Sequence, residues 1–264
     1  MLKPIKISRS GLRLFLECPR CFWLEQHHKI RRPPSYPYTL SAAVDYLVKR
    51  EFDKYRIKGE LPPVFAKFFE ANPAQNLSAD RQQKGRVLGG VKLYPGEELA
   101  DWRNNFRGIG YQDEDLGATL YGAIDDILQF PDGSLAVVDY KSSGSKEITI
   151  YDDYQKQMDV YAYILSRMGR QTHPEAYFVF YQVDKSGNGF ANALNFREEL
   201  RNVKVDAAWV PGAFEQAVKI ARQEAPPQAS PTCTHCQYVQ AARAHLPSAI
   251  HSVTSDEDYR IVKE

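Results

Sequence analysis

The chain has 264 residues, of which 43% are hydrophobic and 25% are charged, and its formal net charge at pH 7 is +1. This length suffices for one sizeable hydrophobic core, and the small net charge argues against a uniformly basic nucleic-acid-binding surface. No segment approaches the roughly 18 apolar residues of a membrane span, and residues 1–15 lack the apolar run of a secretory signal. We therefore expect a cytoplasmic protein with no membrane partner.

The N-terminal part of the chain is predicted to be helical in two places. Residues 11–28 have apolar side chains at helical spacing, with an interruption expected near Pro19. Residues 31–38 contain three prolines and predict an extended linker, after which residues 39–56 again show helical spacing. Residues 57–105 contain four further prolines and show no regular pattern.

From about residue 106 the hydrophobic pattern changes to period two, which is typical of strands. Residues 118–130 and 134–141 predict two strands joined by a hairpin at Pro131-Asp132-Gly133. The remaining predicted elements are a helix at 153–168, a strand at 175–183, a neighbouring strand at 190–197 and a final helix at 207–223. This order of helices and strands predicts an α/β or α+β fold.

The strand predicted at 134–141 ends in charged residues, although its first half is apolar. Alternate side chains share one face of a strand, so Asp139 and Lys141 point the same way as Leu135 and Val137. Burying an ionised carboxylate and an ammonium costs several kcal/mol unless they are paired or bind something. The pattern therefore indicates either a binding site at the sheet edge or an ion pair on a surface hairpin.

The turn of the hairpin decides which aspartate lies opposite Asp139. A three-residue Pro-Asp-Gly loop pairs position 125 with 139, whereas a two-residue Asp-Gly turn pairs position 126 with 139. Either Asp125 or Asp126 therefore joins Asp139 and Lys141. Two carboxylates and a strand carbonyl make a hard-oxygen site suited to Mg²⁺ or Mn²⁺, and a neighbouring lysine can orient or deprotonate a metal-bound water.

Three segments in this order, YGAIDDI, PDGSLAVVDYKSS and YQKQMDVYAYIL, resemble the core of the PD-(D/E)XK nuclease superfamily, in particular its RecB-type branch. That branch has Gly-x-x-Asp on one strand, Asp-x-Lys on the next strand and Gln-x-x-x-Tyr on a helix. The matching residues here are Gly122 and Asp125, Asp139 and Lys141, and Gln157 and Tyr161. The resemblance favours Asp125 over Asp126, and therefore the three-residue turn.

The resemblance implies a restriction-endonuclease-like α/β core, with a central mixed β-sheet flanked by helices. It also implies metal-dependent hydrolysis of DNA phosphodiester bonds, in which Asp125 and Asp139 hold Mg²⁺ or Mn²⁺ and Lys141 assists the attacking water. Gln157 and Tyr161, four residues apart on one helix face, would position the strand. Single-stranded DNA or duplex ends are the expected substrates, and a helicase or a CRISPR or repair protein is the expected partner.

One position departs from the family pattern. RecB-type enzymes often carry a histidine on the first core helix that completes the metal site, and residues 39–56 offer Asp45 at that place. An aspartate is a good Mg²⁺ ligand, so Asp45 is a third candidate metal ligand, and Glu51 is a weaker candidate on a different helix face. The alternative is a catalytically inactive nuclease-fold protein that binds DNA or acts as a scaffold.

All four cysteines fall in two Cys-x-x-Cys pairs, Cys18 with Cys21 and Cys233 with Cys236. Such pairs are the usual halves of a tetrahedral Cys₄ metal site. CRISPR-associated and helicase-linked RecB-type nucleases hold a 4Fe-4S cluster with cysteines from both ends of the domain, usually one N-terminal and three C-terminal. The resemblance therefore implies a 4Fe-4S cluster, and a structural Zn²⁺ is the alternative because the arrangement here is two and two.

The cysteine pairs also define the predicted domain organisation. Because they lie far apart in the chain, the terminal segments 1–38 and 224–264 are expected to come together as a clasp over the remaining residues. We therefore predict one PD-(D/E)XK nuclease-like domain over residues 1–264.

Overall fold

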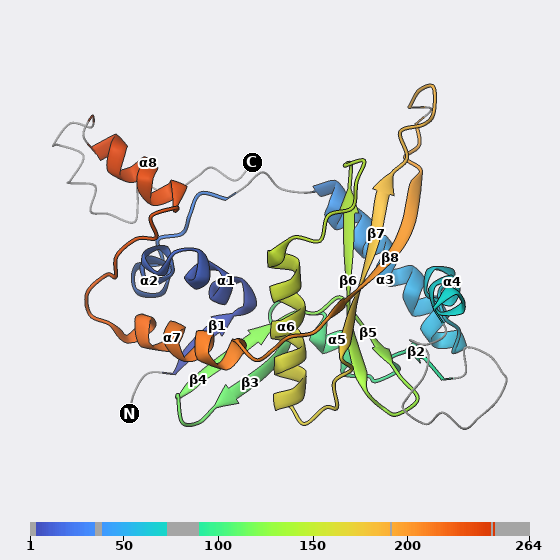
Figure 1. The fold of residues 1–264 in the computed structure, drawn as a ribbon, viewed down its shortest axis with the longest axis horizontal. Coiled ribbons are helices and arrows are strands. Elements are labelled where there is room, and N and C mark those ends of the chain that lie inside the picture. Colours follow the sequence, from blue (N-terminus) through green and yellow to red (C-terminus); the bar gives the residue numbers. More distant parts are fainter. Residues whose placement is uncertain (1–3, 35–38, 73–89, 191, 244, 246–264) are drawn as a thin grey trace.

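The computed structural model describes residues 4–34, 39–72, 90–190, 192–243 and 245, which form two β-sheets and the helices packed around them (Figure 1). The linker predicted at 31–38 lies partly outside these residues, as do parts of the segments 57–105 and 224–264. In the part of the chain that is described, no helix is both long enough and apolar enough to span a membrane.

The larger sheet has five strands, which are β2 (Lys92–Leu93), β5 (Asp126–Gln129), β6 (Leu135–Ser143), β7 (Glu175–Val183) and β8 (Phe196–Lys204). They lie in the order β2-β5-β6-β7-β8. β6 and β7 are parallel and the other neighbouring pairs are antiparallel, so the sheet is mixed, as predicted. The helix α6 (Asp152–Arg167) forms the crossover that a parallel pair requires.

Helices cover both faces of this sheet (Figure 1). α6 lies on one face, and α3 (Thr39–Lys58) and α4 (Pro63–Ala71) lie on the other. Because neighbouring strand residues point to opposite faces, Val137 belongs to the hydrophobic core on the α6 side and Val138 to the core on the α3 side. The same alternation directs Asp139, the next residue of β6, toward α6.

The second sheet and the remaining helices come from both ends of the chain and from its middle. They are β1 (Ile5–Ser8), α1 (Arg9–Glu17), α2 (Pro19–His28), α5 (Leu99–Trp102), β3 (Ile109–Asp113), β4 (Ala118–Gly122), α7 (Val210–Arg222) and α8 (Thr234–Arg243). The strand order is β1-β4-β3, with β1 parallel and β3 antiparallel to β4. Phe22 of α2, Leu120 of β4 and Phe214 of α7 belong to the same buried cluster as Val137, so this sheet shares its core with the α6 side of the larger one.

The break between α1 and α2 falls where proline predicts it. α1 follows Ser8, whose Oγ accepts a hydrogen bond from the Gly11 N–H at 2.9 Å. The helix ends at Glu17, and Pro19 is the first residue of α2, where its missing N–H leaves no hydrogen bond unmade. Cys18 lies between the two helices and is buried.

One predicted strand is in fact two strands in different sheets. Within residues 118–130, β4 belongs to the smaller sheet and β5 to the larger one, and residues 123–125 link them. In this link the Ile124 N–H donates to the Trp102 carbonyl at 3.1 Å, and the Ile124 side chain is buried. The prediction of a single strand is wrong because Ile124 remains buried across the link, so the apolar pattern continues through the change of sheet.

Other predictions agree with the structure to different degrees. The helix at 153–168 and the strand at 175–183 correspond to α6 and β7. By contrast, 57–105 contains α4, β2 and α5 where no pattern was evident, and the neighbour of β7 begins at Phe196. α7 is not the final helix, since α8 follows it; α8 buries none of its residues, so no apolar stripe marks it in the sequence.

The hairpin between β5 and β6 has the three-residue turn. The Phe130 N–H donates to the Ser134 carbonyl at 2.9 Å, and Gly133 has φ +84°, which favours glycine. Asp126 pairs with Val138 in the ladder, so the preceding residue, Asp125, lies opposite Asp139. The predicted register is confirmed.

Candidate active site and four-cysteine site

Asp139 and Lys141 lie at the end of β6 and meet Gln157 of α6. The Lys141 Nζ lies 2.5 Å from Asp139 Oδ2 and 3.5 Å from Gln157 Oε1. The Gln157 amide donates to Asp139 Oδ1 at 2.5 Å. Strand alternation and one helical crossover therefore bring three of the predicted site residues into direct contact.

Asp139 is almost completely buried, with 2% of the residue exposed. Burial and the nearby charge of Asp125 raise its pKa to about 7, although Lys141 acts in the opposite direction. Its Oδ2 lies 2.5 Å from the Lys141 ammonium, which is the one partner of this oxygen among the described residues. One ammonium and one amide leave further acceptor positions of this buried carboxylate unused among the described residues, so Asp139 fits the role of a metal ligand.

Asp125 lies in the link between the two sheets and is partly exposed, with 22% of its side chain accessible. Its Oδ2 accepts a hydrogen bond from the Tyr140 N–H at 3.2 Å. Its Oδ1 contacts the Lys49 ammonium of α3 at 2.8 Å. Asp125 immediately precedes β5, so it lies opposite Asp139 without belonging to either sheet.

Asp126, the alternative to Asp125, belongs to a different environment. Its side chain is fully buried and pairs with Arg56 and, at 2.7 Å, with Arg103. It also accepts hydrogen bonds from the Tyr140 hydroxyl at 2.6 Å and from the Ile127 N–H at 2.8 Å. Every acceptor direction of Asp126 is thus used within the core on the α3 side, which leaves no oxygen for a metal.

Asp45 lines a cleft of about 530 Å³ together with Lys141 and Tyr154. Burial and the charge of Asp125 raise its pKa, although Lys49 acts in the opposite direction. The Lys49 Nζ lies 2.8 Å from Asp45 Oδ2 and 2.8 Å from Asp125 Oδ1, so one ammonium joins the two carboxylates. The structure therefore places Asp45 on the same side as Asp125, with Lys49 between them.

The three aspartates do not form a compact ligand group. Among the described residues, only the four cysteines bring three or more candidate ligand atoms within 4.8 Å of one another. The Lys49 ammonium lies between Asp45 and Asp125 and contacts an oxygen of each, so it keeps the two carboxylates apart. Asp125 and Asp139 lie opposite each other in the register of the hairpin, and the charge of Asp125 is near enough to raise the pKa of Asp139.

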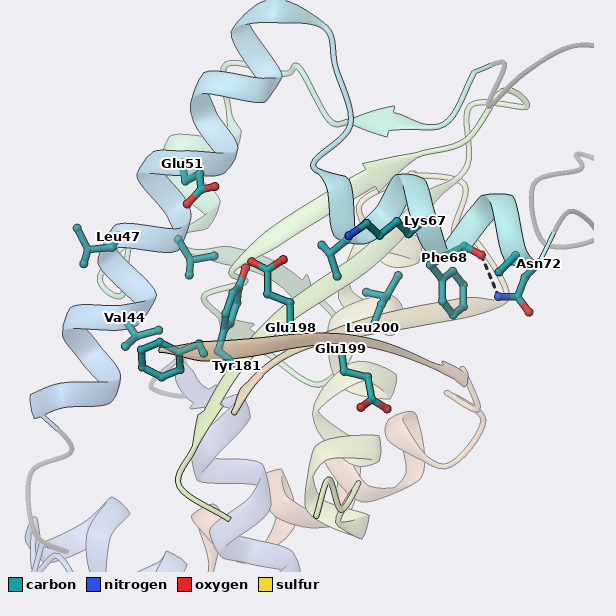
Figure 2. A pocket seen from close by; sticks show the side chains of 14 residues that line it. Val44, Leu47, Glu51, Lys67, Phe68, Asn72, Tyr181, Glu198, Glu199 and Leu200 are labelled. Atoms are coloured by element: carbon teal, nitrogen blue, oxygen red, sulfur yellow. Dashed lines mark hydrogen bonds between the residues drawn. The ribbon is translucent and has the colours of Figure 1, made fainter. Parts of the chain in front are cut away.

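Glu51, the weaker candidate, lies in a neighbouring groove of about 700 Å³ between α3, α4 and β8 (Figure 2). Val44 and Tyr181 line both the groove and the cleft beside Lys141, so the two hollows adjoin. Burial and the charge of Glu51 raise the pKa of Glu198 in the same groove. Glu51 thus lines this groove and influences Glu198 there, and it is not part of the cleft beside Lys141.

Tyr161 lies one turn beyond Gln157 on α6 and is buried. A Cβ atom at Gly122 would lie 2.7 Å from Tyr161 Cε1, which is too close for any side chain. Gly122 is therefore required by the approach of the Tyr161 ring to β4. This packing explains why a motif that ends in Asp125 begins with glycine.

Two residues near the site went unrecognised in the sequence. Arg9, the first residue of α1, donates a hydrogen bond to the Tyr161 side chain and lies within electrostatic reach of Asp139. Lys49 contacts Asp125. The spacing of Lys49 four residues after Asp45 is a signal that these side chains share a helix face, but no local pattern connects Arg9 to residues more than a hundred positions away.

The four cysteines lie at the starts of two helices. Cys18 precedes α2 and Cys21 is in its first turn, while Cys233 precedes α8 and Cys236 is in its first turn. Their Sγ atoms are 3.6 Å apart for Cys21 and Cys236, 3.7 Å for Cys21 and Cys233, and 3.8 Å for Cys18 and Cys236. All four lie within 4.8 Å of one another, and this convergence fits a metal ion.

Hydrogen bonds to backbone atoms hold the two ends of the chain together around this site. The Trp23 indole donates to the Gln223 carbonyl at 2.8 Å, and Arg20 donates to the Pro227 carbonyl at 2.9 Å. Burial raises the pKa of Cys18, but hydrogen bonds from the backbone N–H groups of Cys21 and Ser230 outweigh this and lower it to about 7. These N–H donors favour the thiolate form of Cys18, which is the form that binds a metal.

A family model described as the PD-(D/E)XK nuclease superfamily matches residues 6–241. The chain belongs to this superfamily. The structure of SSO0001 is 14% identical to it with a TM-score of 0.35, covering 94% of this chain and 90% of that chain. The structure of LHK-Exo in complex with dAMP is 10% identical with a TM-score of 0.38, covering 92% of this chain and 95% of that chain. At these TM-scores the two structures carry no further argument, and no curated protein matches the chain.

Proposed function

We propose that this protein is a metal-dependent deoxyribonuclease of the RecB-type branch. The observation that carries the proposal is the buried Asp139 carboxylate, which lies opposite Asp125 and has only the Lys141 ammonium and the Gln157 amide as partners among the described residues. A purely structural carboxylate at this depth would be expected to be fully hydrogen-bonded.

Asp125 and Asp139 would hold Mg²⁺ or Mn²⁺, with Asp45 as a candidate further ligand. Oxygen ligands of this kind suit both ions. When bound, such an ion polarises a phosphodiester oxygen and lowers the pKa of its water.

Lys141 has the clearest role among the side chains that would not bind metal. Its Nζ lies 2.5 Å from Asp139 Oδ2 and 4.6 Å from the centre of the Tyr154 ring, at the edge of the cleft. From this position it can orient the attacking water beside Asp139 and stabilise negative charge that develops on the phosphate. Gln157 keeps Asp139 and Lys141 in register, since it contacts both.

DNA is the proposed substrate, as single strands or duplex ends, and a helicase or a CRISPR or repair protein is the proposed partner; both follow from the family resemblance. Arg9 is partly exposed next to Asp139 and can contact the DNA backbone, whereas the buried Tyr161 would act by accepting the hydrogen bond of Arg9. Arginine is well suited to phosphate because its donors form a planar fork.

The test is cleavage of labelled single-stranded and duplex DNA by anaerobically purified protein with Mg²⁺ or Mn²⁺. The Lys141→Ala variant should cut about 10²- to 10⁴-fold more slowly, whereas Lys219→Ala, an equal change of charge on the distant α7, should cut like wild type. Metal-independent cutting, or equal rates for wild type and Lys141→Ala, would refute the proposed mechanism.

The second candidate function is a catalytically inactive protein that binds DNA or acts as a scaffold. The contact of Lys49 with both Asp45 and Asp125 favours it, because a lysine held there competes with metal. In this case DNA binding would persist without cleavage, and Lys141→Ala would weaken it only by the loss of one charge.

For the four-cysteine site we propose Zn²⁺ in preference to the 4Fe-4S cluster. With Zn–S bonds of ~2.3 Å, the edges of a tetrahedral site are ~3.8 Å long; three of the Sγ separations are 3.6 to 3.8 Å, and all four atoms lie within 4.8 Å of one another. A cubane cluster places four iron atoms and four sulfides between its cysteines, which requires sulfur atoms farther apart than these.

Elemental analysis and a visible spectrum of the anaerobic protein separate the two metals. We expect zinc in a one-to-one ratio to the chain and no absorption band near ~400 nm. Stoichiometric iron and sulfide with such a band would establish the cluster. In either case we propose one domain over residues 1–264, with the terminal segments 1–38 and 224–264 joined at this site.

A further inference from the structure

We propose that Lys49 is an internal counter-cation of the metal site, which a divalent ion must displace from Asp125 in order to bind. This inference rests on the proposed function, because it assigns Asp125 to the metal. When no metal is present, Lys49 would hold the carboxylates of Asp45 and Asp125 in place.

The geometry of Lys49 is that of a shared cation. Its Nζ lies 2.8 Å from an oxygen of Asp45, on the same helix, and 2.8 Å from an oxygen of Asp125, in the link between β4 and β5. The side chain is only 22% exposed, so water screens these contacts weakly. Contacts of this length between an ammonium and two carboxylates are charge-assisted hydrogen bonds, which are stronger than neutral ones.

The charges around Lys49 favour this arrangement. Its ammonium contacts one oxygen of Asp45 and one oxygen of Asp125, so a single positive charge serves both carboxylates. Without Lys49, Asp45 and Asp125 would repel each other across the gap. A divalent ion at Asp125 offers two positive charges where the ammonium offers one, so it can replace the Lys49–Asp125 contact at the expense of separating that pair.

A second consequence concerns the Lys49 ammonium after a metal ion has displaced it from Asp125. Lys49 is on α3, which reaches the cleft through Asp45, and the cleft also contains Lys141. Once released from Asp125, Lys49 would keep its i,i+4 contact with Asp45. It would then present a positive charge at the cleft, where a substrate phosphate would lie.

The experiment is titration calorimetry of Mn²⁺ into the full-length, metal-loaded four-cysteine protein, which needs no catalytic activity. Lys49→Gln should bind Mn²⁺ about tenfold more tightly than wild type, because no ammonium competes for Asp125. Lys49→Arg, which keeps the charge, should remain close to wild type. Lys54→Gln, the same substitution at an exposed position of α3, is the matched control and should not change the affinity.

Asp125→Asn distinguishes the possible failures. If its Mn²⁺ binding is lost while Lys49→Gln binds no more tightly than wild type, the metal site stands and the role of Lys49 is refuted. If neither wild type nor Lys49→Gln binds Mn²⁺, the proposed function fails and this inference fails with it. Mn²⁺ should also raise the melting temperature of Lys49→Gln more than that of wild type, and an equal or smaller rise would count against the role of Lys49.

Discussion

Each face of the five-stranded sheet buries one aspartate of the hairpin, and the two aspartates are held in opposite ways. On the α3 side, Asp126 is surrounded by Arg56, Arg103, the Tyr140 hydroxyl and a backbone N–H. On the α6 side, Asp139 has a single lysine and one amide as partners, and its pKa is raised to about 7. A buried carboxylate that is fully paired supports the fold, whereas one that is incompletely paired can bind a ligand.

The largest effect is expected on the paired side. Asp126→Ala removes the partner of two buried arginines, which leaves their charges uncompensated, and should lower the free energy of unfolding by about 3–5 kcal/mol. Urea denaturation would measure the change. Asp115→Ala, at an exposed aspartate, should stay within about 0.5 kcal/mol of wild type, and a similarly small change in Asp126→Ala would contradict the structural role of Asp126.

The four cysteines are a third group of anions for this comparison, because a bound metal ion would balance the charge of their thiolates. Cys233→Ser removes one thiolate, so the metal should be lost, and the free energy of unfolding should fall by about 2–5 kcal/mol, as for the loss of a long-range cross-link. Metal analysis and thermal denaturation of the same preparation would test this. A variant that loses its metal but melts like wild type would show that the backbone contacts of Trp23 and Arg20 alone hold the ends together.

On the α6 side, the stability of the protein is predicted to depend on pH through Asp139. Because the folded-state pKa of Asp139 is raised to about 7, its contribution to stability is present at low pH and is lost as the pH rises from about 4 to about 7. Asp139→Asn lacks this titration, so without Mg²⁺ or Mn²⁺ it should become more stable than wild type by on the order of 2–4 kcal/mol above pH 8.

Melting curves from pH 4 to pH 9, in buffer freed of divalent ions, would follow this difference. Adding Mn²⁺ at pH 8 should stabilise the wild type and leave Asp139→Asn unchanged, since the ion favours the ionised carboxylate. A stability difference that is constant over the whole pH range would show that the carboxyl of Asp139 is not perturbed.

The smallest effect concerns packing rather than charge. Gly122→Ala places a methyl group 2.7 Å from the Tyr161 ring, and the resulting overpacking should cost about 1–3 kcal/mol of unfolding free energy. Gly212→Ala is the matched control, because nothing lies within 4 Å of its Cβ position in α7. The control should be neutral or slightly stabilising, and an equally mild Gly122→Ala would show that Tyr161 can move away at little cost.

The parts of this site that local chain geometry determines could be predicted from the sequence. The hairpin at Pro131-Asp132-Gly133 leaves two registers, of which the family resemblance selects the one with Asp125 opposite Asp139, and strand alternation predicts that Lys141 shares its face with Asp139. The four-residue spacing on α6 likewise puts Gln157 and Tyr161 on one face. Each of these relations involves residues close together in sequence, so a short pattern is enough to reveal it.

The remaining features depend on contacts between distant segments. Lys49 reaches Asp125 across 76 positions of the chain, and Arg9 meets Tyr161 only because β1 pairs with β4. The change of sheet at Ile124 depends on the Trp102 carbonyl. No periodicity or turn signal records such contacts, because they arise from the way the layers pack after the elements have formed.

The position of the four cysteines along the chain has a consequence for biosynthesis. Cys21 and Cys233 are 212 positions apart, so at roughly 5–20 residues per second the ribosome needs about ten to forty seconds between making one half of the site and the other. During this interval the N-terminal pair has no partners within the nascent chain. A chain that holds the metal tightly must therefore have been translated as far as α8, and a chain that stops earlier would not hold the metal tightly.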